Sequence, residues 1–281
     1  MLIADPGLAH LVSPMVLREP EHLATSTWLG HIPFAFWLVE AFQPRVFVEL
    51  GTYAGASYCA FCQAVKELGL ASAGYAVDTW EGDDHTGFYG QVVYNRLARY
   101  HEPRYGSFSR LLRSTFDAAL SHFADGSIDL LHIDGLHTYE AVQHDFAVWR
   151  PKLSDRAVVL LHDTNVREQD FGVWRFWEEL TAAYPSFAFL HSAGLGVAAV
   201  GRNLPAAIHW LVQVPRRHPE ILPIIQNYFA RLGQAVEMQY VLSQQGRQVQ
   251  NWLDWLRQTV HYRWLWLTGR LPRTGPPPRF S

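Results

Sequence analysis

Apolar positions along the chain follow two patterns, short continuous runs and longer stretches with helical spacing. Apolar and aromatic residues recur at helical spacing over residues 28–41. The segment Gln43-Pro44-Arg45 interrupts this spacing, and the apolar run 46–50 follows it. This order predicts a helix, a turn and a strand. The next two elements are a predicted helix over 57–68 and a predicted short strand over 74–78.

A glycine-containing turn joins the first predicted strand to the helix after it. The turn holds Gly51 and Gly55, and the next strand ends at Asp78. Strand, glycine turn, helix and strand form the βαβ unit of nucleotide-binding sheets, which bind ligands at the carboxyl ends of their parallel strands. We expect the two glycines to let the backbone approach a cofactor closely, and Asp78 to accept hydrogen bonds from ribose hydroxyls.

Two later apolar runs, 128–134 and 157–163, each end in an aspartate and predict two more strands. Residues 138–149 between them have amphipathic helical spacing, with Thr138 placed to cap the helix. A hairpin-like pair of strands within residues 187–200 closes the domain. We therefore predict an α/β fold with a Rossmann-like, mostly parallel seven-stranded sheet that has helices on both faces.

The character of the chain changes near residue 204. Gln and Arg become more frequent, Gly becomes scarce, and residues 221–267 show helical apolar spacing. We predict an α/β domain with an N-terminal helical segment over residues 1–203, a C-terminal helical extension over 204–271 and a flexible Pro-rich tail over 272–281. We expect the extension to pack against the main domain or to join identical chains into a homo-oligomer; a membrane-surface contact is the alternative.

Composition narrows the class of protein. With 49% hydrophobic and 17% charged residues, the chain of 281 residues is too apolar to be largely disordered. Its formal net charge of −3 provides no positive field to attract nucleic acid. Two cysteines, the acidic Asp5 near the N-terminus and the lack of a long apolar stretch favour a cytoplasmic protein without a membrane span.

The spacing of the glycines distinguishes between two kinds of cofactor. A dinucleotide site has the pattern G-x-G-x-x-G, whose tight turn aims a helix N-terminus at a pyrophosphate. This chain has G-x-x-x-G over residues 51–55, preceded by Glu49 and followed by Ser57. The wider loop resembles the first motif of class I S-adenosylmethionine-dependent methyltransferases. The alternative is a tight strand-to-helix turn that binds no ligand.

Three further motifs, at residues 75–80, 133–139 and 161–165, strengthen this resemblance. In order along residues 34–201, the set resembles a bacterial class I methyltransferase family that accompanies glycosyltransferases and sugar-tailoring enzymes. The resemblance implies S-adenosylmethionine as the cofactor, with Trp80 beside its adenine. The residues that it implies at the cofactor are Glu49, Gly51, Thr52, Tyr53, Gly55, Ser57, Asp78, Thr79, Trp80, Ser114 and Asp134.

Asp134 and Asp163 end neighbouring strands of the predicted sheet and form a candidate metal site. Two carboxylates on one rim suit Mg²⁺, which lowers the pKa of a coordinated hydroxyl. Metal-dependent relatives often place another Asp or Asn directly after the second carboxylate, whereas here Thr164 follows and Asn165 comes one position later. The alternative is structural, with Asp134 capping a helix and Asp163 binding neighbouring polar groups.

His137 is the first candidate for a general base. It lies three positions after Asp134, at the start of a helix, and an imidazole there could take a proton from a substrate hydroxyl. His162 is the rival base and a candidate substrate contact, although strand alternation predicts that it points away from Asp163. His85 and Tyr89, in the aromatic, glycine-rich loop after Asp78, are candidate substrate or lid contacts.

Together these features predict an S-adenosylmethionine-dependent O-methyltransferase that acts on a hydroxyl of a sugar or glycan with the help of Mg²⁺. The expected partners are a small-molecule or glycan substrate, associated glycosyltransferases and further copies of the chain, with no nucleic acid. Two alternatives remain open, an NAD-dependent sugar-modifying oxidoreductase and a non-catalytic glycan-binding or scaffolding module on the same fold. The lack of G-x-G-x-x-G disfavours the first.

Overall fold

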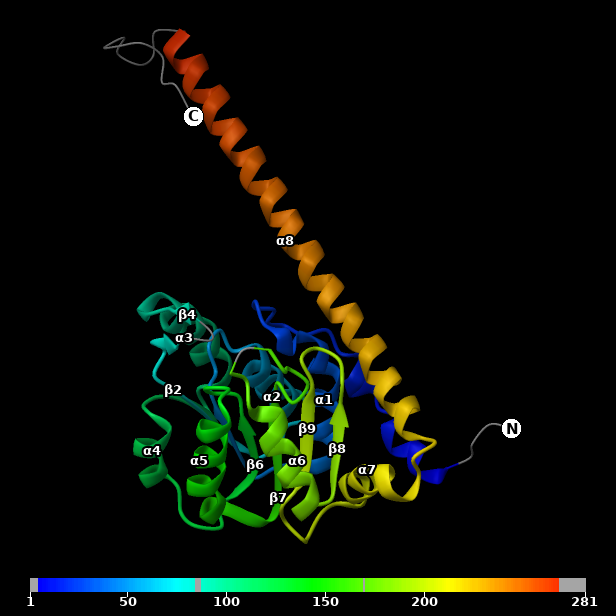
Figure 1. The fold of residues 1–281 in the computed structure, drawn as a ribbon. Helices are drawn as coiled ribbons and strands as arrows, with labels where there is room; N and C mark the ends of the chain where they lie inside the picture. The colour runs from blue at the N-terminus through cyan, green and yellow to red at the C-terminus, as the bar shows by residue number, and fades with distance from the viewer. Residues whose placement is uncertain (1–4, 84–86, 169, 268–281) are drawn as a thin grey trace. The chain divides into compact units, whose positions relative to one another are not determined.

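A seven-stranded sheet forms the centre of the computed structural model, which describes residues 5–83, 87–168 and 170–267 (Figure 1). The strand β9 runs antiparallel to both of its neighbours, and the other neighbouring pairs are parallel. This arrangement confirms the predicted Rossmann-like, mostly parallel sheet. In order across the sheet, the strands are β5 (Ser109–Arg113), β2 (Ala73–Asp78), β1 (Val46–Leu50), β6 (Ile128–Ile133), β7 (Leu153–His162), β9 (Leu195–Ala199) and β8 (Ser186–Phe189).

Helices cover both faces of the sheet, as predicted (Figure 1). One face carries α4 (Phe116–Ala119), α5 (Tyr139–Trp149) and α6 (Val173–Ala183). The other carries α1 (Ile32–Phe42), α2 (Ala56–Glu67), α3 (Gln91–Tyr105) and α7 (Ala206–Arg217). The smaller elements are the pair β3 (Gly82–Asp83) and β4 (Gly87–Phe88), and the 3-10 helices η1 (Pro6–Leu11), η2 (Pro14–Leu17), η3 (Thr27–His31), η4 (Leu120–His122) and η5 (Arg150–Lys152).

The central strands form where the sequence has continuous apolar runs. Every residue of β6 is buried, as expected for a parallel strand that is covered on both faces. The helix α5 begins where predicted, because the hydroxyl of Thr138 accepts a hydrogen bond from the N–H of Ala141. The strand β5 was not predicted, because its sequence Ser-Arg-Leu-Leu-Arg is mostly polar and Ser109 is its one buried residue.

The last helix, α8 (Leu222–Leu267), begins inside the first compact unit of the fold, which ends at Val236. Its residue Phe229 packs against the rings of Phe34, Trp37 and Phe189. The prediction placed the end of the α/β domain at residue 203, whereas α7 and the start of α8 belong to this compact unit.

The rest of α8 belongs to a second unit that starts at Glu237. Assembly of identical chains through this helix stays a prediction, and the predicted tail 272–281 lies outside the described residues. Within the described residues, we find no helix that is both long and apolar enough to cross a membrane. Exposed apolar side chains on α8 include those of Met238, Leu242, Val249 and Trp252.

The ends of β1 and β6 are in close backbone contact. The N–H of Asp134 donates to the carbonyl of Leu50 at 2.8 Å, and a Cβ on Gly51 would lie 2.1 Å from the carbonyl oxygen of Asp134. The φ angle of Gly51 is also +87°, in the left-handed region. A glycine is therefore required at position 51, because any side chain would clash with the backbone at the end of β6. The sequence had suggested a different reason, the close approach of a cofactor.

Replacing Gly51 by alanine should destabilise the fold much more than the same change at Gly69. Gly69 also has a positive φ, but an added Cβ there meets nothing within 4 Å. Gly69→Ala should cost about 1–2 kcal/mol in the free energy of unfolding. Gly51→Ala should cost about 3 kcal/mol or more, because the backbone must also shift. Urea unfolding followed by circular dichroism measures both, and equal losses would contradict this account.

Candidate functional site

The glycine loop between β1 and α2 is held by the carboxylate of Asp78, at the end of β2. Its Oδ2 accepts hydrogen bonds from the N–H groups of Thr52 and Tyr53, each at 2.8 Å, and its Oδ1 accepts one from the N–H of Trp80 at 2.6 Å. The side chain is buried. Asp78 thus fixes the conformation of the loop, a role that the sequence did not suggest.

The rings around this loop form a second support. Trp80 is fully buried, and its indole N–H donates to the carbonyl of Tyr53 at 2.8 Å. The ring of Tyr53 lies 4.6 Å from that of Tyr89, centroid to centroid. Tyr89, a predicted substrate contact, therefore lies beside the loop, whereas His85 falls outside the described residues. A contact between Trp80 and adenine stays a prediction.

The other predicted cofactor residues lie at the same edge of the sheet. Ser57 is buried in the first turn of α2. The N–H of Ser114 donates to the carbonyl of Asp78 at 3.0 Å, and the carbonyl of Thr79 accepts from Arg113 at 3.2 Å. The ends of β2 and β5 are thereby joined beside the loop.

Glu49 belongs to a buried polar chain that links three distant parts of the sequence. The indole N–H of Trp28 donates to Nε2 of His132 at 3.1 Å, so that Nε2 must be the unprotonated nitrogen. Nδ1 of His132 then donates to Oε2 of Glu49 at 2.9 Å. The second oxygen of Glu49, Oε1, is buried and has no hydrogen-bond partner among the described residues.

Trp28 and His132 were not among the residues predicted for the site. A signal for His132 was present, because it lies two positions before Asp134 and strand alternation places both on the same face of β6. Trp28 could not be found this way, since it lies before the sheet begins and reaches β6 only in the folded chain.

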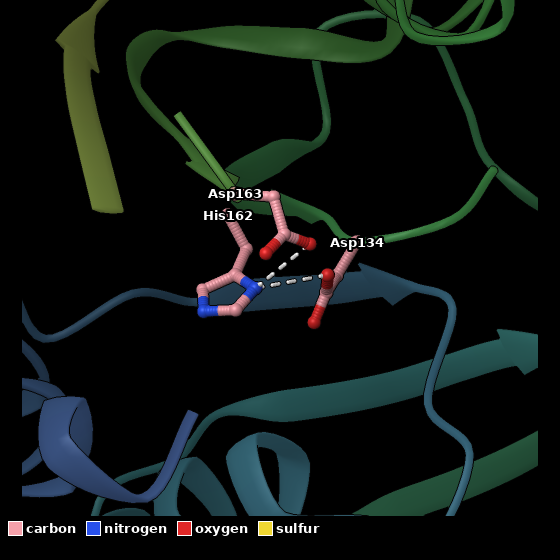
Figure 2. Close-up of side chains that lie close together, drawn as sticks. All are labelled: Asp134, His162 and Asp163. Atoms are coloured by element: carbon pink, nitrogen blue, oxygen red, sulfur yellow. Dashed lines mark ion pairs between the residues drawn. The ribbon is translucent and has the colours of Figure 1, made fainter. Parts of the chain in front are cut away.

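Asp134, His162 and Asp163 form one cluster at the ends of β6 and β7, and Figure 2 shows their side chains converging. Nδ1 of His162 lies 3.3 Å from Oδ1 of Asp134 and 3.3 Å from Oδ2 of Asp163. One ligand atom from each of the three residues lies within 4.8 Å of the others. The cluster therefore has the composition and spacing of a site for a metal ion.

The prediction that His162 points away from Asp163 is wrong. Strict alternation would turn consecutive side chains to opposite faces of a strand. Asp163 has a φ angle of +58°, in the left-handed region, so the chain leaves the extended conformation directly after β7. This turn brings the carboxylate of Asp163 back to the imidazole of His162.

The β8–β9 hairpin fixes the ring of His162. Nε2 of His162 and Nε2 of His31 both donate to the carbonyl of Ser192, each at 3.1 Å. Ser192 and Ala193 both have positive φ angles, +49° and +69°, which non-glycine residues adopt only at a cost. The strained hairpin thus provides one carbonyl oxygen as an acceptor for two buried histidines.

His137 lies beside the cluster and contacts both of its carboxylates. Its Nε2 lies 2.9 Å from Oδ2 of Asp163 and 3.6 Å from Oδ1 of Asp134. The ring of Phe171 stacks on its imidazole at 4.8 Å. Asn165, by contrast, does not join the cluster, because its side-chain amide donates to the carbonyl of Leu190 at 3.0 Å.

The two histidines of this region are cationic at neutral pH. Burial acts to lower the pKa of His137, but hydrogen bonds to Asp134 and Asp163 outweigh it and raise the pKa to about 9. Burial also acts to lower the pKa of His162, but its interactions with Asp134 and Asp163 outweigh burial and raise the pKa to about 10. Burial would raise the pKa of each carboxyl group, but the imidazoles hold the pKa of Asp134 and of Asp163 below the usual value. His137 in this state is a proton donor, whereas the sequence suggested a general base.

Part of the region just described matches a model of a known protein family. Residues 48–164 match the family model described as a methyltransferase domain. The matched stretch starts in β1, contains the glycine loop and Asp78, and ends directly after Asp163.

Among known proteins, the uncharacterized protein y4gI of Sinorhizobium fredii (strain NBRC 101917 / NGR234) is 49% identical to the chain over 210 residues. The match covers 75% of this chain and 23% of that protein, so the chain spans about a quarter of this relative's length.

Solved methyltransferase structures are similar at a low level. The O-methyltransferase TomG of Streptomyces achromogenes, in complex with SAM, is 16% identical, with a TM-score of 0.47 over 70% of this chain and 91% of TomG. A methyltransferase of Geobacter sulfurreducens is 16% identical, with a TM-score of 0.47 over 71% of this chain and 91% of its own. Cofactor-bound Rv0187 from MTB is 19% identical, with a TM-score of 0.47 over 72% and 93%. Similarity at this level is no evidence about substrate or reaction.

In metal-free protein, the imidazoles of His137 and His162 should titrate with midpoints of about 9 and about 10. Because both pKa values exceed the usual 6.5, the stability from these ion pairs is fully present below pH 6.5 and is lost as pH rises through 9 to 10. Two-dimensional NMR of the ring nitrogens measures the midpoints, with His137→Gln and His162→Gln variants for assignment. Midpoints at or below the usual value would refute the arrangement.

Proposed function

We propose that the chain transfers the methyl group of S-adenosylmethionine to a hydroxyl oxygen. The observation that carries this proposal is the position of the glycine loop directly beside the Asp134, His162 and Asp163 cluster, within a methyltransferase domain. A loop for the methyl donor and a group of acids and imidazoles for the acceptor lie at one edge of the sheet, where α/β sheets bind ligands.

The residues at the glycine loop suit S-adenosylmethionine. The amino-acid end of the cofactor carries an ammonium group, and the buried Oε1 of Glu49 has no hydrogen-bond partner among the described residues. The buried hydroxyl of Thr52 likewise has none. A buried polar group without a partner is costly, so these two atoms are candidate contacts for the cofactor. Asp78 has one further lone pair, on Oδ1, for a ribose hydroxyl beyond the three hydrogen bonds that it already accepts.

The transfer is a displacement at the methyl carbon. The hydroxyl oxygen forms the new bond to carbon, the bond from carbon to sulfur breaks with its electron pair going to sulfur, and the hydroxyl proton must leave. Catalysis therefore needs alignment and a proton acceptor more than covalent chemistry.

His137 is our candidate for the proton acceptor, at its Nε2. The imidazole can accept a proton only when it is neutral. Asp134 and Asp163 stabilise its cationic form, so their effect on the pKa of His137 must first be weakened. Asp134 and Asp163 would hold a divalent cation such as Mg²⁺, whose positive charge would weaken their stabilisation of the protonated imidazole. When bound, such a cation also lowers the pKa of a coordinated hydroxyl.

We propose a sugar or glycan as the acceptor and a glycosyltransferase as an associated enzyme, because the motifs resemble the family that accompanies glycosyltransferases. This part of the proposal rests on the ordered motifs at residues 75–80, 133–139 and 161–165. A panel of free sugars and oligosaccharides, with tritiated methyl donor, tests it.

Calorimetry with S-adenosylhomocysteine tests the cofactor site. Asp78→Ala should weaken binding by about thirtyfold or more, because the loop loses three backbone hydrogen bonds and the ribose loses its acceptor. Asp117→Ala, which removes an exposed carboxylate on α4, should leave the affinity unchanged. Circular dichroism checks that both variants fold. Undiminished binding by the Asp78 variant, or tighter binding of NADH than of S-adenosylhomocysteine by the unmodified chain, would contradict the proposal.

A further inference from the structure

His162 adds a nitrogen donor to the two carboxylates of the candidate metal site. We infer that Nδ1 of His162 is a direct metal ligand and that the cluster therefore selects a transition-metal dication, such as Mn²⁺, Fe²⁺, Co²⁺ or Zn²⁺, over Mg²⁺. This inference rests on the proposed function for the role of the metal, and it replaces Mg²⁺ as the ion that the site prefers.

The spacing of the donor atoms fits one small cation. Nδ1 of His162 lies 3.3 Å from a carboxylate oxygen of Asp134 and from one of Asp163. Ligands bound at about 2.0–2.2 Å lie roughly 3.0–3.5 Å from their nearest neighbours in octahedral or tetrahedral sites. The three side chains therefore already stand at the distances of neighbouring ligands around one ion (Figure 2).

The surroundings of His162 are those of a metal-binding histidine. Histidine ligands almost always donate their second ring N–H to a carbonyl or carboxylate, which fixes the ring and its tautomer. Nε2 of His162 donates to the carbonyl of Ser192 at 3.1 Å, so Nδ1 is the nitrogen that faces the carboxylates. The ring is only 2% exposed, and the same carbonyl binds the fully buried His31. His162 is thus held in place from outside the cluster.

The type of donor decides the preferred ion. Mg²⁺ is a hard ion that takes oxygen ligands and retains several waters, whereas imidazole favours the later first-row dications. Among the described residues, the third ligand of the cluster, beside the two carboxylates, is a ring nitrogen of His162. The side-chain oxygen of the nearby Asn165 accepts a hydrogen bond from Arg167 instead, and its amide nitrogen donates to the carbonyl of Leu190. A mixed site of one nitrogen and two oxygens should therefore discriminate against Mg²⁺.

Pulsed electron paramagnetic resonance of the Mn²⁺-loaded full chain tests the ligand directly. The spectrum should contain modulation from a coordinated imidazole nitrogen, and labelling of the histidines with ¹⁵N should change the modulation to that of the heavier isotope. This measurement needs no variant. Absence of nitrogen coupling in the unmodified protein would overturn the inference.

Calorimetry with Mn²⁺ and with Mg²⁺ alone tests the selectivity. The chain should bind Mn²⁺ at least about tenfold more tightly than Mg²⁺. His162→Asp supplies a third carboxylate, and it should lose the nitrogen coupling and reduce the ratio of the two affinities severalfold. His122→Asn, a change at an exposed histidine of η4, should leave coupling and ratio unchanged. Equal affinities for the two ions in the unmodified chain would overturn the inference, as would nitrogen coupling retained in His162→Asp.

The two proposals fail in different ways. Binding of S-adenosylhomocysteine without a preference for Mn²⁺ would overturn the inference and leave the proposed methyl transfer standing. Nitrogen-coordinated Mn²⁺ without any binding of S-adenosylhomocysteine would support the inference about the metal and contradict the proposed function.

Discussion

The backbone contact between the ends of β1 and β6 determines the geometry of the whole edge of the sheet. Gly51 lies so close to the carbonyl of Asp134 that no side chain fits between them, and the N–H of Asp134 is bound to Leu50. The loop that we assign to the cofactor and the cluster that we assign to the acceptor therefore share one boundary. The distance between methyl donor and acceptor is consequently set by sheet register, which is a rigid feature of the fold.

Buried polar groups are the second constraint, because each one requires a partner inside the protein. The partners of the site come from distant segments: Trp28 and His31 precede the sheet in the sequence, and Ser192 lies in the turn between β8 and β9. These segments fix the tautomer of His132 and the orientation of His162. The backbone at Ser192 and Asp163, with positive φ angles, places a carbonyl and a carboxylate at the ring of His162.

The sequence was sufficient to predict the sheet and the acids along its edge. Apolar runs that end in Asp78, Asp134 and Asp163 are a local signal, and parallel strands bring their carboxyl ends together. The hydrogen bonds of Trp28 with His132 and of His31 with Ser192 could not be predicted, because each joins residues more than a hundred positions apart. The orientation of His162 was wrong because it depends on a single left-handed residue, which strand alternation does not anticipate.

The central claim is that one edge of the sheet holds both S-adenosylmethionine and a metal ion that His162 coordinates. A crystal structure with S-adenosylhomocysteine and Mn²⁺, using anomalous scattering to locate the metal, tests it most directly. We predict the cofactor along the loop of residues 51–55 and the Mn²⁺ ion at about 2.0–2.3 Å from Nδ1 of His162 and from oxygens of Asp134 and Asp163. A cofactor bound elsewhere, or an ion that does not contact His162, would contradict the account.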